Sequence, residues 1–251
     1  MSEWIVGRNP VYEVLRAKRR ELYQLRIAQG MDKSDRLTAI LRLASQAGIP
    51  VKHIPRPRLE VLGSGHQGVA LKTKSYPYAE VTDLIQQATQ RKEPLFILLL
   101  DVLKDPQNLG TLIRTAEAVG IHGVVLPYRR TATVTPAVVS ASSGACEHML
   151  IAQANLAQTI TSLKEEGAWV VGLEAGDDAQ KPGEIDLTGP IVVVVGSEKQ
   201  GMRHLVRSSC DFLMKLPMRG KIDSLNAAVA GSVALYLVWG ARDYSNNTLT
   251  R

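Results

Sequence analysis

Two continuous runs of apolar residues constrain the fold of this chain more than any other feature. They are Leu95–Leu100 and Val192–Val195, and neither run alternates between apolar and polar side chains. A strand with one face in water alternates, whereas an unbroken apolar run is typical of a strand buried on both faces. Amphipathic helix patterns, such as Leu109–Val119 and Leu156–Glu166, lie between the two runs. Alternation of strands and helices indicates an α/β fold, with a mostly parallel sheet and helices on both faces.

The remaining elements divide the chain into two domains. In the front part, we expect helices at residues 8–20 and Ser34–Ala47, a helical turn at Leu59–Leu62, and strands at Leu22–Ala28, Val51–Ile54 and Val69–Lys74. Later in the chain, we expect strands at Gly123–Leu126, His148–Ala152, Trp169–Leu173, Ile191–Val195 and Phe212–Leu216, and a helix at Thr135–Ser142. The pattern predicts a small α/β domain over residues 1–75, a linker over 76–93 and a larger domain over 94–251.

Positive charge is concentrated in the small domain. Residues 1–75 hold 14 Lys and Arg against 6 Asp and Glu, whereas residues 76–251 hold 16 against 18. The basic residues gather in three clusters, Arg16–Arg20, Arg56–Arg58 and Lys72–Lys74. Clustered cations favour nucleic-acid binding over a merely solvated surface.

Several common kinds of site are not supported by the sequence. Cys146 and Cys210 lie far apart, with no His or Cys at metal-ligand spacing, so we expect free thiols in a reducing cytoplasm and no metal. Gly63–Gly68 matches G-x-G-x-x-G, but it follows a basic helical turn and precedes a strand, which inverts the dinucleotide-binding context. There is no signal-peptide pattern, and the apolar run Ala227–Trp239 is too short to span a bilayer. We therefore expect a soluble cytoplasmic protein without membrane contacts.

Two polar segments follow the two apolar runs. The chain leaves the first run at Asp101 and enters a helix, for which Asn108 is the expected N-cap and on which Arg114 lies. The second run ends at Gly196 and Glu198. A carboxylate at the end of a buried strand requires a partner, and Arg114 is suitable.

A third segment, Leu216–Asn226, contains Pro217, which cannot donate to a sheet ladder and so should end the preceding strand. Ser224 is the expected N-cap of a long helix rich in Ala, Val and Leu. A strand end, a loop and a helix N-terminus together form a concave place where backbone N–H groups face a ligand. We expect all three segments to line one pocket.

These segments resemble the three ordered motifs of the SpoU (TrmH/RlmB-type) family of RNA 2′-O-ribose methyltransferases. The matching residues are Asn108 and Arg114, then Gly196, Glu198 and Gly201, then Leu216–Met218 with Ser224–Asn226. Residues 1–75 resemble the family's RNA-binding domain of ribosomal-protein L30e type. The likeness points to the subgroup that methylates guanosine in bacterial 23S ribosomal RNA. One departure is Lys199-Gln200, where a small or acidic pair is common.

The resemblance implies a SPOUT-type α/β fold with a C-terminal trefoil knot, S-adenosylmethionine as cofactor, and a homodimer with the pocket at its interface. The implied cofactor-binding residues are Gly196, Gly201, Leu216, Met218 and Leu225, and the implied catalytic residues are Asn108, Arg114, Glu198, Ser224 and Asn226. On the basic domain, the expected RNA contacts are Arg8, Arg19, Arg20, His66, Gln67 and Lys72.

The implied reaction is attack of a ribose 2′-hydroxyl on a sulfonium methyl group. Arg114 corresponds to the family's catalytic arginine, and because an arginine hardly loses its proton, it is expected to stabilise developing alkoxide charge and hold the adjacent phosphate. Direct proton abstraction is the alternative. The substrate is expected to be ribosomal RNA, free or in a pre-ribosomal particle. The alternatives are transfer RNA, another ribosomal nucleotide as in antibiotic-resistance enzymes, and a non-catalytic RNA-binding role in ribosome assembly.

Overall fold

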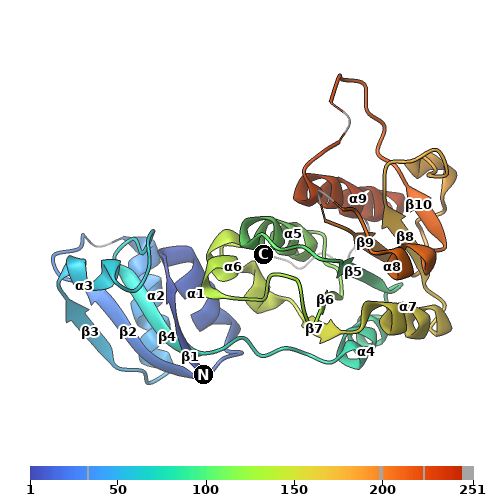
Figure 1. Ribbon diagram of the computed structural model, residues 1–251. Coiled ribbons are helices and arrows are strands. Elements are labelled where there is room, and N and C mark those ends of the chain that lie inside the picture. The colour runs from blue at the N-terminus through green and yellow to red at the C-terminus, as the bar shows by residue number, and fades with distance from the viewer. Residues whose placement is uncertain (33, 198–199, 223, 245–251) are drawn as a thin grey trace. The chain divides into compact units, whose positions relative to one another are not determined.

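The computed structural model describes residues 1–32, 34–197, 200–222 and 224–244. The chain forms two compact units (Figure 1). The first unit consists of Met1–Pro77 together with Thr133–His148, and the second consists of Tyr78–Ala132 together with the chain from Met149 onward. The segment Thr133–His148 therefore belongs to the first unit, although it is flanked in sequence by strands of the second.

The first unit contains a sheet with the strand order β1-β4-β2-β3. Its elements are β1 (Ser2–Val6), α1 (Arg8–Ala17), β2 (Leu22–Ala28), α2 (Asp35–Gln46), β3 (Val51–Ile54), α3 (Arg56–Glu60), β4 (Val69–Lys74), α6 (Pro136–Ala141) and the 3₁₀ helix η1 (Ala145–His148). Strand β4 runs antiparallel to β1 and β2, and β2 runs parallel to β3. Strand β1 was not expected, because a five-residue strand at the chain start has no preceding turn signal.

A buried ion pair fastens η1 within the first unit. The Arg20 guanidinium donates to both carboxylate oxygens of Glu147, at 2.6 Å and 2.9 Å, and both side chains are fully buried. Arg20 also pairs with Glu3. The Tyr76 hydroxyl donates to the Cys146 carbonyl at 3.1 Å. Since buried charges are tolerated only when paired and hydrogen-bonded, this network specifies where η1 packs.

The second unit contains a sheet with the strand order β10-β8-β9-β5-β6-β7, and every pairing in it is parallel. Its elements are α4 (Val81–Arg91), β5 (Phe96–Leu100), α5 (Pro106–Ala118), β6 (Gly123–Pro127), β7 (Ile151–Ala154), α7 (Leu156–Glu165), β8 (Trp169–Leu173), η2 (Pro182–Glu184), β9 (Ile191–Val195), α8 (His204–Ser208), β10 (Phe212–Met214) and α9 (Ala227–Ala241). The predicted α/β class with a parallel sheet is confirmed. The trefoil knot stays a prediction.

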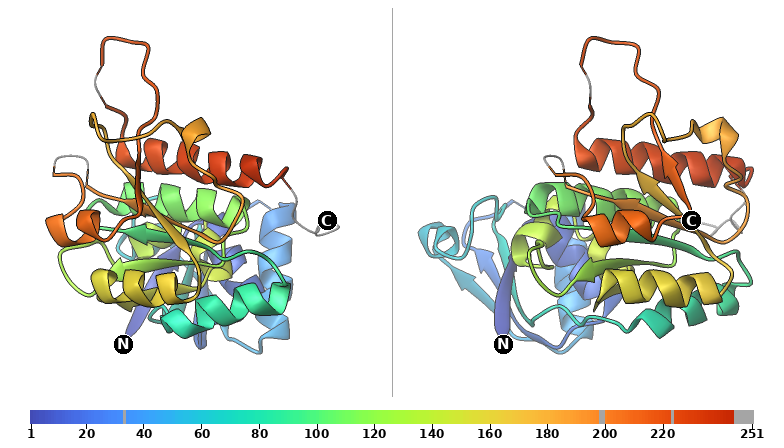
Figure 2. Two further views of the ribbon diagram at one scale, coloured as in Figure 1. Left: turned by 90° about the vertical axis from the view of Figure 1, so that its right-hand side faces the viewer. Right: turned by 45° about the vertical axis from the view of Figure 1, so that its right-hand side comes forward.

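Helices cover both faces of this sheet (Figure 2). One core joins α4, α7 and α8 to alternate side chains of β5 and β9, such as Ile97 and Val192. On the other face, α9 approaches so closely that a Cβ added to Gly231 would lie 2.6 Å from Leu112 of α5 and 3.1 Å from Val195 of β9. Glycine at this position permits the close packing of α9 on the sheet.

Helix α4 lies within the predicted linker, yet its Leu84 and Ala88 are buried in the core of the second unit. Ala79, just before it, bridges to Ala152 of β7. All of the predicted linker after Pro77 is therefore part of the second unit. In the described part of the chain, no helix has both the length and the apolar character needed to cross a membrane.

Candidate functional site

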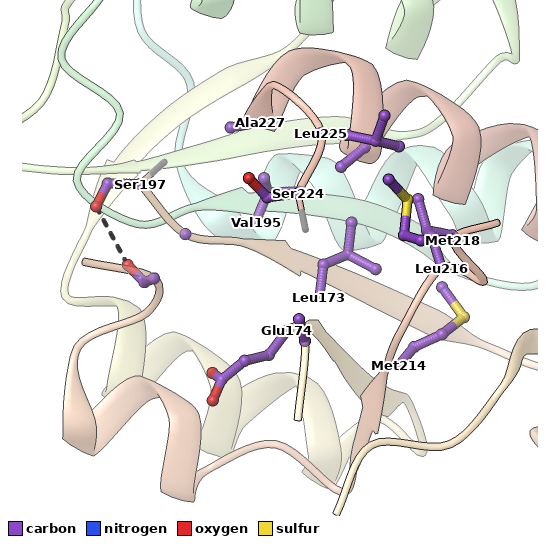
Figure 3. A pocket seen from close by; sticks show the side chains of 14 residues that line it. Leu173, Glu174, Val195, Ser197, Met214, Leu216, Met218, Ser224, Leu225 and Ala227 are labelled. Atoms are coloured by element: carbon purple, nitrogen blue, oxygen red, sulfur yellow. Dashed lines mark hydrogen bonds between the residues drawn. The ribbon is translucent and has the colours of Figure 1, made fainter. Parts of the chain in front are cut away.

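A cavity of about 230 Å³ lies at the carboxyl ends of β8, β9 and β10, beside the start of α9 (Figure 3). It is lined by Leu173, Glu174, Ala175, Val195, Gly196, Ser197, Gly201, Met214, Leu216, Met218, Ser224, Leu225, Ala227 and Ala230. Most of these residues are apolar, and Glu174 is the ionisable one among them. Ligands of open parallel sheets bind outside the carboxyl ends of the strands, which is where this cavity lies.

The cavity brings together five residues that the sequence assigned to cofactor binding. Gly196 and Gly201 come from the loop after β9, Leu216 and Met218 from the loop after β10, and Leu225 from the residues before α9. These positions are up to 29 residues apart in the sequence, and the parallel strand order makes them neighbours. Their roles in binding stay predictions.

Glycine is required at position 196 by the geometry of its own loop. A Cβ at this position would lie 2.3 Å from the carbonyl carbon of Gly201 and 2.4 Å from the backbone nitrogen of Met202. Ser197 and Gly201 exchange backbone hydrogen bonds of 3.0 Å and 2.9 Å. The tight turn of this loop therefore requires glycine at position 196, and the implied role of Gly196 in cofactor binding stays a prediction.

The same loop is tied to β5 by a residue that the sequence reasoning missed. Asp101 is fully buried directly after β5, and its carboxylate accepts from the backbone N and the Nε of Arg203, both at 2.7 Å. Such charge-assisted bonds are stronger than neutral ones and fix geometry. The signal was present in the sequence, because Asp101 directly follows an apolar run.

The N-terminal ends of α5 and α9 meet through two asparagines. The Asn226 side-chain nitrogen donates to Oδ1 of Asn108 at 3.1 Å. The predicted caps were both wrong: Asp105 caps α5 by accepting from Gln107 and Asn108, and Asn226, not Ser224, caps α9. In each case an alternative cap residue stood two or three positions away, and apolar periodicity does not resolve that distance.

Arg114 lies exposed on α5, in sequence between two residues of this helix that contact α9, Asn108 and Thr115. The first contact is the asparagine pair, and the second joins the hydroxyls of Thr115 and Ser232 at 2.9 Å. Glu198, its predicted partner, and Lys199 lie outside the described residues. The Arg114–Glu198 pair therefore stays a prediction.

A second cavity, of about 320 Å³, adjoins the first through Ser197, which lines both. Its other lining residues are Val102, Leu103, Lys104, Asp105, Asn108 and Gln200. Val102 has a φ of 61°, in the left-handed region, which a β-branched residue rarely adopts. Strain of this kind is typical of functional sites, where the surrounding structure holds it in place.

The predicted RNA contacts of the first unit differ in how far their side chains are exposed. Arg20 is buried in its ion pairs, and His66 is 6% exposed with its Nδ1 accepting from the Gly68 backbone N–H at 2.9 Å. A direct RNA contact by either side chain is incompatible with this burial. Arg19 donates to the Tyr76 hydroxyl at 3.1 Å, and Lys72 is half-buried on β4.

Arg8 and Gln67 instead line an open cavity of the first unit. Arg8 donates from its backbone N–H to the Gln67 side chain at 3.0 Å and from its Nη1 to Ser34 at 3.2 Å. Two further arginines, Arg36 and Arg56, line the same cavity. Arg36 was missed because it lies outside the three basic clusters of the sequence.

Neither cysteine has the environment of a reactive thiol. Burial raises the pKa of the Cys146 thiol well above its usual range, and it raises the pKa of Cys210 to about 12. Reactive cysteines have lowered pKa values, because the thiolate is the nucleophile. Among the residues that the structure describes, no group of three His, Cys, Asp or Glu side chains could hold a metal ion.

Two family models match this chain. Residues 95–236 match the SpoU rRNA Methylase family, and residues 4–79 match the RNA 2′-O ribose methyltransferase substrate-binding domain. The chain belongs to the SpoU methylase family. The predicted family and the predicted RNA methyltransferase class are confirmed, and the match at residues 95–236 includes all three loops of the candidate site.

Several relatives and solved structures match nearly the whole length of this SpoU chain. A Bacillus subtilis protein assigned to the TrmH family of tRNA/rRNA methyltransferases, YacO, is 42% identical over 96% of this chain and 96% of its own length. The SpoU methyltransferase AviRb from Streptomyces viridochromogenes, solved with AdoMet, has a TM-score of 0.78 at 20% identity, covering 97% of this chain and 92% of its own. The AdoMet-bound rRNA methyltransferase from Sinorhizobium meliloti has a TM-score of 0.78 at 23% identity, covering 98% and 88%. At these identities the two structures show a common fold.

Proposed function

We propose that this SpoU methyltransferase transfers the methyl group of S-adenosylmethionine to a ribose 2′-hydroxyl of ribosomal RNA, and that the target is a guanosine of 23S ribosomal RNA. The observation that carries the proposal is the convergence of the loops after β8, β9 and β10 on one apolar cavity. The segment after β5, which was expected to line the same cavity, lines the adjoining one instead and meets the start of α9 through the Asn108–Asn226 pair. Helix α5 bears Arg114, the residue that the reaction requires most.

The lining of the cavity is suited to S-adenosylmethionine. Leu173, Leu216 and Leu225 offer apolar walls for an adenine ring, while Ser224 and the backbone of the surrounding loops offer polar partners for a ribose and an amino-acid tail. When bound, the cofactor supplies an electrophilic methyl group on a sulfonium, and its leaving group is neutral. The AdoMet-bound neighbours from Streptomyces viridochromogenes and Sinorhizobium meliloti share the fold that carries this cavity.

In this proposal, the protein acts mainly on the hydroxyl. The Arg114 guanidinium stabilises the negative charge that develops on the 2′-oxygen, because a positioned cation lowers the free energy of the developing charge. Asn108, Asn226 and Ser224 orient the ribose and the cofactor tail, which lowers the entropic cost of the encounter. Glu198 is proposed to steady Arg114.

The second cavity is proposed to receive the target nucleotide. It adjoins the first at Ser197 and includes Asn108, so a ribose held there would lie beside the proposed cofactor site. The exposed Lys104 on its rim is a suitable partner for a phosphate. Substrate selection is proposed to rest on the first unit, which matches the substrate-binding model and has an arginine-lined cavity.

The proposed assembly is a homodimer. Helix α9 exposes three large apolar residues along one side, Val229, Val233 and Tyr236, with exposed fractions of 47%, 40% and 46%. They follow one another at spacings of four and three residues, so they form a continuous stripe. A second copy of the chain is proposed to cover this stripe, because exposed contiguous apolar surface is typical of interfaces.

The test compares Arg114→Ala and Arg114→Lys with the wild-type protein, using tritiated S-adenosylmethionine and ribosomal RNA from cells that lack the protein. We expect both variants to lose at least about 100-fold in the rate of methyl transfer. Cofactor affinity, measured by calorimetry, should change less than about threefold, because Arg114 does not line the cavity. A wild-type rate in Arg114→Ala contradicts the proposed role.

The same assay separates the alternatives. Transfer RNA and ribosomal RNA are offered in parallel, since the name of the Bacillus subtilis relative covers both. Mapping of 2′-O-methyl positions then identifies the nucleotide. Failure of the wild-type protein to methylate either RNA, with intact RNA binding, would favour a non-catalytic role.

A further inference from the structure

We propose that Tyr128, Arg129 and Arg130, named here the β6 rim, form an RNA-positioning surface that holds the strand flanking the target nucleotide. This inference rests on the proposed function and adds residues that the three sequence motifs do not contain. The three residues directly follow β6, which ends at Pro127. Because all strands of the sheet are parallel, the rim lies at the same edge as the candidate site.

Two hydrogen bonds hold the loop of the β6 rim beside the second cavity. The Thr131 hydroxyl donates to the Leu103 carbonyl at 2.8 Å, and the Ala132 backbone N–H donates to the same oxygen at 2.7 Å. Leu103 lines the cavity that also includes Asn108. The residue that follows the rim, Thr131, is thus hydrogen-bonded to a residue that lines the proposed nucleotide site. A strand bound on the rim would continue into that cavity.

The side chains of the β6 rim are available to a ligand. Tyr128 is 67% exposed, and both arginines are exposed. Within the described residues, Arg129 and Arg130 form neither an ion pair nor a side-chain hydrogen bond. By contrast, Arg203 and Arg207 of the same unit each bind a carboxylate. The rim arginines therefore have no structural partner to lose when they bind RNA.

The composition of the rim fits a single strand of RNA. An exposed aromatic ring stacks on any base, and adjacent guanidinium groups bind phosphates and can also stack. Lys104, which follows Leu103, adds a third cation beside the rim. This local positive charge is notable because residues 76–251 hold fewer Lys and Arg (16) than Asp and Glu (18). Stacking and phosphate contacts carry little sequence information, so the rim should position RNA rather than select it.

The experiment uses the full-length protein with the double substitution Arg129→Gln/Arg130→Gln, and Lys92→Gln as the matched control. Lys92 is also an exposed cation of the second unit, but it precedes β5 and so lies toward the opposite edge of the sheet. Ribosomal RNA binding is measured by filter retention at several salt concentrations, and methyl transfer is measured as separate kcat and KM values for RNA.

We expect the double variant to weaken RNA binding about tenfold and to reduce the slope of log K against log salt by about 1 to 2, because two phosphate contacts are lost. The KM for RNA should rise in proportion, while kcat and cofactor affinity stay within about threefold. Tyr128→Ala should weaken binding about tenfold, and Tyr128→Phe should restore it, because the ring rather than the hydroxyl stacks.

Unchanged RNA affinity and salt slope in the double variant, relative to Lys92→Gln, would overturn the proposal. It would equally be overturned if Tyr128→Phe were as defective as Tyr128→Ala. The binding measurement needs no turnover. If the wild-type protein methylates no RNA, the proposed function fails, while RNA affinity still decides the role of the β6 rim.

Discussion

The buried ion pair of the first unit and the candidate site of the second unit use polar residues in opposite ways. In the first unit, the side chains of Arg20 and Glu147 are fully buried and paired with each other, and Arg20 also pairs with Glu3. In the second unit, Asn108, Ser224 and Asn226 are at least partly exposed beside an apolar cavity. A buried, saturated group is committed to the fold, whereas a polar group at the opening of a cavity can exchange its partners for a ligand. The chemistry of a side chain thus predicts a role only once its burial is known.

The largest effect that would sharpen this contrast is expected from Glu147→Ala. Glu147→Ala leaves the buried Arg20 with Glu3 as its remaining carboxylate partner, so the cost should approach but not exceed the about 3–5 kcal/mol of a fully broken buried pair. Urea unfolding should show this loss in the free energy of unfolding. Glu147→Gln, which keeps an acceptor for Arg20, should lose distinctly less. A loss below about 1 kcal/mol in Glu147→Ala would break the contrast between the units.

The second largest effect is expected from Gly196→Ala, in the turn that lines the cavity. The added Cβ would lie 2.3 Å from the backbone of Gly201, so the loop must shift. Overpacking of this kind costs about 1–3 kcal/mol, and the displaced loop should weaken cofactor binding at least tenfold by calorimetry. Gly220→Ala is the control, because nothing lies within 4 Å of its added Cβ. Equal cofactor affinities in the two variants would argue against the assignment of this cavity.

A smaller effect is expected from Asn226→Ala, which removes the cap of α9. Its Oδ1 accepts from Ala228 and Val229, at 2.9 Å and 3.2 Å. Loss of a cap costs about 1 kcal/mol, and Asn226→Ser should recover most of it. Ser224→Ala should leave thermal stability unchanged, because Ser224 does not cap the helix. Its expected defect is in methyl transfer alone, whereas Asn226→Ala should lose both stability and methyl transfer, because Asn226 is also proposed to orient the ribose.

The smallest effect is a loss of stability above neutral pH, to which both units should contribute. The folded-state pKa values of Cys146 and Cys210 are raised by burial, in the latter to about 12. Their stabilisation is therefore present below the unfolded pKa of about 8.5 and decreases as pH rises toward the folded value. From pH 7 to 8.5, the expected decrease in unfolding free energy is less than about 1 kcal/mol.

Cysteine variants show how much each unit contributes to this decrease in unfolding free energy. Cys146→Ala should reduce the pH dependence through the first unit, and Cys210→Ala through the second. Native thiols should also react slowly with iodoacetamide at pH 8, because little thiolate forms. Rapid labelling of either cysteine in the native protein would contradict the assigned burial.

Much of the second unit could be predicted because its strands have a strong signal. The runs that became β5 and β9 are apolar at every position, and their burial on both faces explains that pattern. Periodicity could not resolve a shift of a few residues, so both helix caps were misassigned. Nor could it reveal the Asp101–Arg203 bond, which joins residues 102 positions apart.

The first unit shows the other limit of sequence reasoning. Its clustered cations indicated RNA binding, but the structure commits Arg20 to Glu147, 127 residues away in sequence. Composition counts charges and does not distinguish a buried pair from a free cation. For the same reason, the affiliation of α6 and η1 with the first unit could not be read from their sequence.

Because Thr133–His148 belongs to the first unit, this segment limits how the domains of related proteins could be exchanged. The substrate-binding half is assembled from two separate stretches of the gene, so a chimera that grafts residues 1–77 alone from one relative to another would pair a donor Arg20 with a host residue at position 147. To exchange substrate specificity between relatives, residues 1–77 and residues 133–148 must therefore be replaced together. This requirement favours gradual divergence over the exchange of a whole domain.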